Sequence, residues 1–124
     1  MKKFFIAMAL VMGAVLIAGC GKDKSQEFEY KYEGRFLTGE NDVADVRSEL
    51  IRQGVYKTDR WLISATTRAE ADGQALNRFK DLVNIAYDIE TKFHDQVDNF
   101  RFQMTLTNED ENKVLKTEIR GTAK

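Results

Sequence analysis

The chain has 124 residues, a formal charge of −1, a single cysteine and no proline. One cysteine excludes an internal disulfide bond. The near-neutral charge, without clustered Lys and Arg, argues against a nucleic-acid partner.

The first 20 residues, MKKFFIAMALVMGAVLIAGC, have the three zones of a secretory signal peptide. Lys2 and Lys3 form the charged start, an unbroken apolar run follows from residue 4 to residue 17, and the small residues Ala18 and Gly19 come last. The apolar run is shorter than the about 20 residues of a membrane-spanning helix. We therefore expect an export signal here and not a permanent transmembrane segment.

The end of this segment, Ile17-Ala18-Gly19-Cys20, resembles the lipobox of bacterial lipoproteins. The resemblance implies that diacylglyceryl is attached to the Cys20 sulfur and that a dedicated peptidase cuts between Gly19 and Cys20, which removes residues 1–19. A thiolate is the nucleophile that such a thioether requires. An ordinary cleaved signal with an incidental cysteine is the alternative interpretation.

Cleavage at this point leaves 105 residues with 17 basic and 20 acidic side chains, a charge of −3, enough for one compact domain. Residues 20–26 are then the lipidated cysteine and a polar tether, whose six residues after Cys20 reach at most about 20 Å. In the lipoproteins that this segment resembles, an aspartate after the cysteine favours the inner membrane. Gly21 stands there, so we expect the outer membrane, facing the periplasm, in a Gram-negative cell, and otherwise the outer face of the cell membrane.

The elements that follow are predicted from hydrophobic periodicity. Residues 27–37 alternate between aromatic and charged side chains, which indicates a strand with one buried face, and Gly34 on the apolar parity indicates a bulge or a close approach by another element. A short helix follows, with Asn41 or Asp42 as its cap, Val43, Val46, Leu50 and Ile51 on its apolar face and Gly54 just beyond its end. Residues 60–66 (RWLISAT) are apolar at consecutive positions, which favours an interior strand covered on both faces, with Trp61 in the core.

A long helix is predicted from residue 68 to residue 94. Thr67 and Glu70 fit a capping box, and an apolar seam repeats in steps of four and three through Ala75, Phe79, Leu82, Ala86, Ile89 and Phe93. Such a seam could form a homodimer as a coiled coil. We favour the alternative, in which the helix lies across a sheet of its own chain.

Two further alternating segments, residues 100–107 and 113–120, form a hairpin around the polar turn 108–112. The order is thus β-α-β-α-β-β. It predicts a single two-layer α+β domain over residues 27–121, with a four-stranded mixed sheet, one short helix and one long helix.

Candidate catalytic chemistry is sparse. His94 is the only histidine, and Glu90 and Asp98 would join it if the long helix continued. Zinc sites usually have a majority of His or Cys ligands, so a polar helix end is the better interpretation. The serines do not lie in a nucleophile elbow, and no phosphate-binding glycine pattern occurs. We expect no catalytic residues, no metal and no cofactor.

Two functions are therefore considered. The first is a non-enzymatic interaction or assembly module, anchored to the membrane through Cys20 and contacting other envelope proteins. The second is a small-ligand binder or weak hydrolase that uses the aromatic strand and His94. Residues 21–124 show no resemblance that decides between them.

Replacing Cys20 with Ala should abolish lipid labelling and leave an uncleaved precursor, because the thioether has no other sulfur donor at this position. Metabolic labelling with radioactive palmitate, read together with the electrophoretic mobility of the precursor, measures both effects. Labelling of the Cys20→Ala chain at the wild-type level would contradict the lipobox interpretation.

Overall fold

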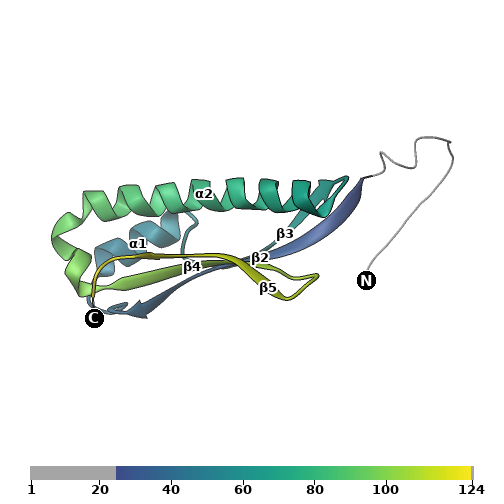
Figure 1. The fold of residues 1–124 in the computed structure, drawn as a ribbon. Helices are drawn as coiled ribbons and strands as arrows, with labels where there is room; N and C mark the ends of the chain where they lie inside the picture. Colours follow the sequence, from purple (N-terminus) through teal and green to yellow (C-terminus); the bar gives the residue numbers. More distant parts are fainter. Residues whose placement is uncertain (1–24, 124) are drawn as a thin grey trace, which may run out of the picture.

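The computed structural model describes residues 25–123, which form one twisted sheet with two helices on one side of it (Figure 1). In chain order the elements are β2 (Gln26–Thr38), α1 (Ala44–Arg52), β3 (Thr58–Ala65), α2 (Arg68–Lys92), the 3-10 helix η2 (His94–Asn99), β4 (Arg101–Asn108) and β5 (Lys113–Arg120). The α+β class and the order β-α-β-α-β-β are confirmed.

The sheet has the order β3-β2-β4-β5, and all three strand pairs are antiparallel. The mixed sheet expected from the sequence is therefore wrong within the described residues. The reason lies in α2, which crosses the sheet from the end of β3 to the beginning of β4. β3 and β4 do run in the same direction, but β2 is inserted between them, so no parallel pair forms.

Strand β2 is one of the two interior strands of the sheet and makes a close contact with the segment before β3. The Gly34 N–H donates to the Lys57 carbonyl at 2.8 Å, and a Cβ atom on Gly34 would lie 2.2 Å from the Val55 carbonyl oxygen. The Tyr32 hydroxyl, which is fully buried, donates to that same Val55 oxygen at 2.5 Å. The close approach predicted at Gly34 is confirmed.

Helix α1 differs in detail from the expectation. Val43 is its N-cap and no side chain caps it, so neither Asn41 nor Asp42 has the predicted role. Val46 and Leu50 are buried, whereas Ile51 is 49% exposed. Gly54 follows the helix with a φ of +78°, the left-handed conformation that a residue just past a helix end adopts.

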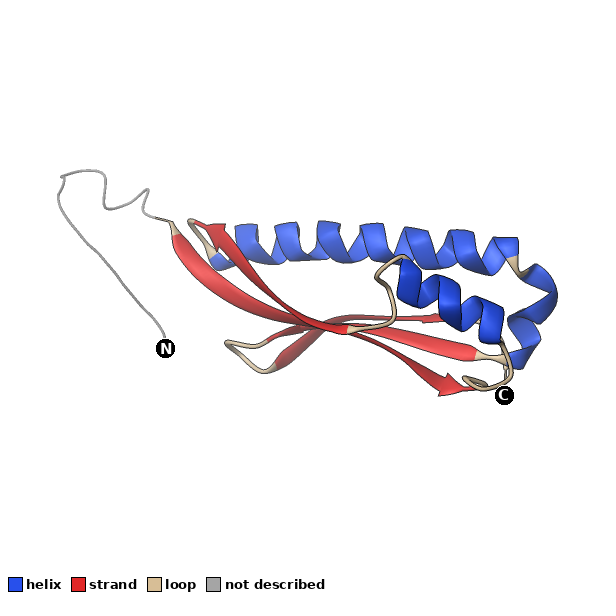
Figure 2. Cartoon of the chain, turned by 180° about the vertical axis from the view of Figure 1, so that it is seen from behind, coloured by secondary structure: helices blue, strands red, loops and turns tan. Residues whose placement is uncertain are grey.

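Helix α2 begins and packs as its sequence indicates. The Thr67 hydroxyl accepts from the Glu70 N–H at 3.2 Å, while the Glu70 carboxylate accepts from Thr66, one residue earlier than a standard capping box provides. The predicted apolar seam faces the sheet of the same chain: Ala75, Phe79, Ala86 and Ile89 are buried and Leu82 and Phe93 are partly buried. Figure 2 shows α1 beside α2 on this same side.

Strand β3 lies at the edge of the sheet and not in its interior. Trp61 is 2% exposed, with its ring parallel to that of Tyr32 at a centroid distance of 5.7 Å and the Arg78 guanidinium 4.3 Å above it. The predicted core position of Trp61 is confirmed. Leu62, however, points to the opposite side and is 66% exposed, so the expectation of a strand covered on both faces is wrong.

Truncation of Phe79 to Ala should lower the free energy of unfolding by about 3–5 kcal/mol, because it leaves a cavity between α2 and the Tyr32 ring. Gln74→Ala, at an exposed position of the same helix, should change the stability by less than about 0.5 kcal/mol. Urea unfolding of both variants measures the difference. Equal midpoints for the two variants would show that the seam is not part of the core.

Candidate interaction surface

Neither α1 nor α2 covers the second side of the sheet (Figures 1 and 2). We call this side the open face. Side chains that alternate with the buried ones point to the open face, and the strand register aligns them across neighbouring strands. They are Glu29, Lys31, Glu33 and Arg35 of β2, Arg60, Leu62 and Ser64 of β3, and Gln103, Thr105 and Thr107 of β4. The row along β2 alternates in charge, from acidic to basic twice. The open face is therefore a mixed-charge surface carried by an interior strand that is paired on both sides.

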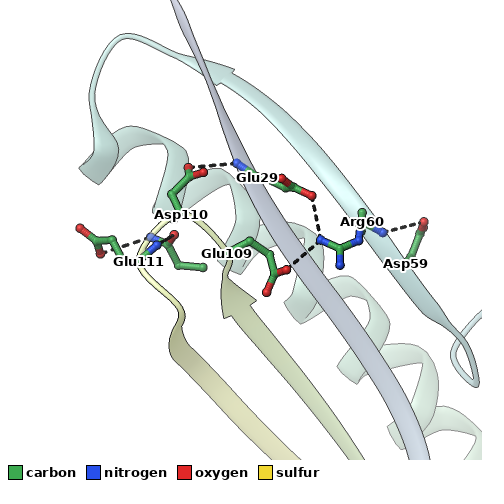
Figure 3. A network of polar contacts seen from close by, with 7 residues as sticks. Glu29, Asp59, Arg60, Glu109, Asp110 and Glu111 are labelled. Atoms are coloured by element: carbon green, nitrogen blue, oxygen red, sulfur yellow. Dashed lines mark hydrogen bonds and ion pairs between the residues drawn. The ribbon is translucent and has the colours of Figure 1, made fainter. Parts of the chain in front are cut away.

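Arg60 connects three segments of the open face (Figure 3). Its Nη1 lies 2.8 Å from a Glu29 carboxylate oxygen and 2.7 Å from a Glu109 carboxylate oxygen. These carboxylates, Glu109 first, raise the pKa of the Arg60 guanidinium above its ordinary value. The side chain is 60% exposed, so water screens the pairs and they contribute little to stability. Their effect is to fix the direction of Arg60 above the junction of β3, β2 and β4.

The β4–β5 turn is held against the beginning of β2. The Glu109 N–H donates to the Glu29 carbonyl at 3.0 Å, and an Asp110 carboxylate oxygen accepts from the Glu29 N–H at 3.2 Å. Asn108 is fully buried and orders the turn, because its side-chain oxygen accepts from the Glu111 N–H at 3.1 Å. The acidic turn is thus a fixed part of this end of the molecule, beside the first residues of β2.

Beneath this end lies a second polar cluster on the side of the helices. The Tyr30 hydroxyl donates to an Asp72 carboxylate oxygen at 2.6 Å. Arg68 places its guanidinium 4.6 Å from the Phe28 ring centre and 3.4 Å from an Asp110 oxygen. Burial raises the pKa of Tyr30 to about 12, and the hydrogen bond to Asp72 contributes in the same direction. The cluster joins the first turns of α2 to the β4–β5 turn.

Glu90, His94 and Asp98 do not form a site, because α2 ends at Lys92 and η2 follows. Glu90 instead accepts from the Gly121 N–H at 2.9 Å and pairs with Arg120 at 3.5 Å, and Asp98 accepts from the Thr122 hydroxyl. His94 is exposed. Residues 121–123 are bound to α2 and η2, because the Thr122 N–H also donates to the Val97 carbonyl at 2.7 Å.

The aromatic strand does not present a binding groove. Phe28, Tyr30 and Tyr32 are at most 7% exposed and belong to the core under α2. The expectation that one face of this strand is buried is confirmed. The surface on which a ligand-binding or hydrolytic function was considered is therefore filled by the protein itself.

The predicted lipidation and cleavage site, Gly19 and Cys20, lies outside the described residues. Within residues 25–123, no helix combines the length and hydrophobicity that a membrane crossing requires. In the same part of the chain, no group of three or more His, Cys, Asp or Glu side chains is arranged to hold a metal ion.

No protein-family model matches the chain, and no curated protein and no solved structure matches it either. The open face thus has to be interpreted from its own geometry.

Sequence reasoning missed the Arg60 cluster. The alternation in β2 correctly placed Glu29 on the solvent side. Arg60, however, follows Glu29 by 31 positions in the chain, and Glu109 follows Arg60 by 49 positions. Only the pairing of β3 and β4 with β2 brings them together. The available signal was the expectation that opposite charges face one another on neighbouring strands.

The Tyr30–Asp72 contact predicts a loss of stability at alkaline pH. The folded pKa of about 12 exceeds the ordinary value of 10, so this contribution is complete below pH 10 and is lost as the pH rises from about 10 to about 12. Tyr30→Phe should cost about 1 kcal/mol at neutral pH and flatten this alkaline decline. Urea unfolding at a series of pH values measures both. Tyr87→Phe, at an exposed position, is the control and should retain the wild-type slope.

Proposed function

We propose that the protein is a lipid-anchored bacterial cell-envelope lipoprotein that acts as a non-enzymatic interaction module. The lipobox-like segment Ile17-Ala18-Gly19-Cys20 supports the anchor, and the open face supports the contact function. The protein is exported and held by lipid on Cys20, at the outer membrane facing the periplasm in a Gram-negative cell and otherwise on the outer face of the cell membrane.

The observation that carries the contact function is the arrangement of charge on the open face. Lys31 lies opposite Arg60 on one neighbouring strand and opposite Thr107 on the other, while Glu33 lies opposite Thr58 and Thr105. Alternating charges on a strand that is paired on both sides give orientation and selectivity to a protein contact, because a partner of the wrong charge pattern is repelled. The exposed Leu62 beside them supplies apolar area that a partner can bury.

The anchor determines how this surface is presented. β2 begins at Gln26, six residues after Cys20, so the end of the sheet at Glu29 and the β4–β5 turn is held near the bilayer. Six residues span at most about 20 Å. Glu109, Asp110 and Glu111 at this end repel anionic head groups, which favours contact with proteins at the membrane over contact with the lipid surface itself. A net charge of −3 for the mature chain also makes nucleic acid a poor partner.

Charge reversal on the open face should disrupt the function, whereas replacement of His94 should not. We expect Lys31→Glu combined with Arg35→Glu to reduce complementation of a deletion strain and to remove proteins cross-linked to the lipidated chain in native membranes. Lys80→Glu, an exposed reversal on α2, and His94→Ala should both behave as wild type at matched membrane levels.

The opposite pattern is equally informative. Loss of function in His94→Ala with silent open-face reversals would contradict the contact proposal and restore the binding or hydrolytic alternative. Loss in Lys80→Glu equal to that of the open-face variant would show that overall charge matters and that the open face does not.

A further inference from the structure

The two edges of the sheet are built differently. β5 forms one edge and carries charged side chains at half of its positions: Lys113, Lys116, Glu118 and Arg120. Its pairing with β4 is interrupted by a register shift between Leu106 and Thr107. Charges and bulges are the devices by which proteins prevent an edge strand from pairing with another chain. The β5 edge is therefore protected.

The β3 edge has fewer of these devices, because its charged residues, Asp59 and Arg60, both lie in its first half. Its register with β2 is unbroken over eight pairs, from Gln26 opposite Ala65 to Glu33 opposite Thr58. From Trp61 to Ala65 the strand carries no charge. Leu62 is 66% exposed, the largest value among the exposed large hydrophobic side chains of residues 25–123. No strand in this part of the chain pairs with the outer side of β3. A regular, apolar and unpaired edge is suited to pair with one more strand.

We propose that this strand is β3 of a second copy of the chain, paired antiparallel about a two-fold axis at Leu62. In an antiparallel pair, residues directly opposite one another lie on the same face of the sheet. Both copies must keep Trp61 and Ile63 on the side of the helices. This requires that the residue nearest the two-fold axis lies directly opposite its own copy in the second chain. This limits the pairing to a few registers, which the side chains distinguish.

The register centred on Leu62 fits best. It places Leu62 opposite Leu62, Arg60 opposite Ser64 and Trp61 opposite Ile63, and it pairs residues 59–65 of both chains. A register centred on Arg60 sets two guanidinium groups against each other, which is destabilising. A register centred on Trp61 sets Leu62 against Arg60 and Ile63 against Asp59. A register centred on Ile63 pairs only residues 61–65.

The Leu62-centred pair produces a continuous eight-stranded sheet with all helices on one side and one doubled open face. The contact is isologous, so it closes at two copies and does not lead to filaments. The protected β5 strands become the two outer edges of the dimer. The inference concerns the folded domain and does not depend on lipidation at Cys20, so it can fail while the anchor proposal holds.

Cross-linking through engineered cysteines tests the register. Leu62→Cys in the full chain, purified in detergent and treated with a mild oxidant, should yield at least five times more covalent dimer than wild type, because opposite Cβ atoms lie about 4.5–5.5 Å apart. Cys20 is present in every variant, and wild type measures its contribution. Ser64→Cys and Val114→Cys are matched controls at exposed positions. In the proposed register the two Ser64 residues are separated by about 13 Å along the strand, beyond the reach of a disulfide.

The outcomes separate clearly. Dimer yields for Leu62→Cys that equal those of the two controls would indicate random collision and overturn the proposal. A higher yield for Ser64→Cys than for Leu62→Cys would indicate a different register and overturn it as well.

Analytical ultracentrifugation of the full chain in detergent gives a second, independent measurement. Wild type should sediment as a dimer, Leu62→Asp as a monomer, and Val114→Asp, on the protected β5 edge, as a dimer. The circular dichroism spectrum should be unchanged because both side chains are exposed. A wild-type chain that is monomeric at about 100 µM, or a dimer that survives Leu62→Asp but is lost in Tyr87→Asp on α2, would contradict pairing through β3.

Discussion

The structure depends on the close approach between Gly34 of β2 and the segment that precedes β3. The Gly34 amide and the Tyr32 hydroxyl donate to the carbonyl groups of Lys57 and Val55, at 2.8 and 2.5 Å, and a Cβ atom at Gly34 would lie only 2.2 Å from the Val55 oxygen. Burial also raises the pKa of Tyr32, because the phenolate could not be solvated there. This contact brings the end of α1 down onto the sheet and starts β3 beside β2. The position of β3 beside β2 follows from it.

Once β2 occupies the centre, the molecule has two unequal faces. The apolar parity of β2 and β4 is buried under the seam of α2, which brings Phe79 against Tyr32 at a ring-centroid distance of 6.1 Å. The charged side chains that alternate with these point to the open face, which neither helix covers. Backbone pairing aligns them in rows across β3, β2 and β4. Because Arg60 joins Glu29 and Glu109 at the junction of these strands, the polar face is ordered by side chains as well as by the backbone. The buried side of the sheet therefore provides the stability of the fold, whereas the charged side chains available for contact with a partner lie on the open face.

The features suited to contact are concentrated toward one end of the sheet. The beginning of β2 pairs with the end of β3, so Gln26 lies opposite Ala65, and the β4–β5 turn is hydrogen-bonded to Glu29. Under the proposed function this is also the end nearest the lipid anchor. A second copy paired through β3 would place two such ends on opposite sides of one axis, each about 10 Å from it along the strand.

The sequence by itself determined the four strands, the two α-helices and their order, and the buried side of β2 and α2, because periods of two and of about 3.6 residues are local properties that Phe28, Tyr30 and Tyr32 or Ala75, Phe79 and Ile89 display directly. It also indicated the close approach at Gly34, and it predicts an export signal in residues 1–20. It did not determine strand order, since the crossover by α2 fits a parallel pair as well as one with β2 inserted between β3 and β4. For that reason the apolar run around Trp61 was interpreted as an interior strand, although edge placement leaves Leu62 exposed. Tertiary structure alone decided that Arg60 meets Glu29 and Glu109, and that Glu90 and Asp98 bind the C-terminal segment and not His94, because these contacts join residues far apart in the chain.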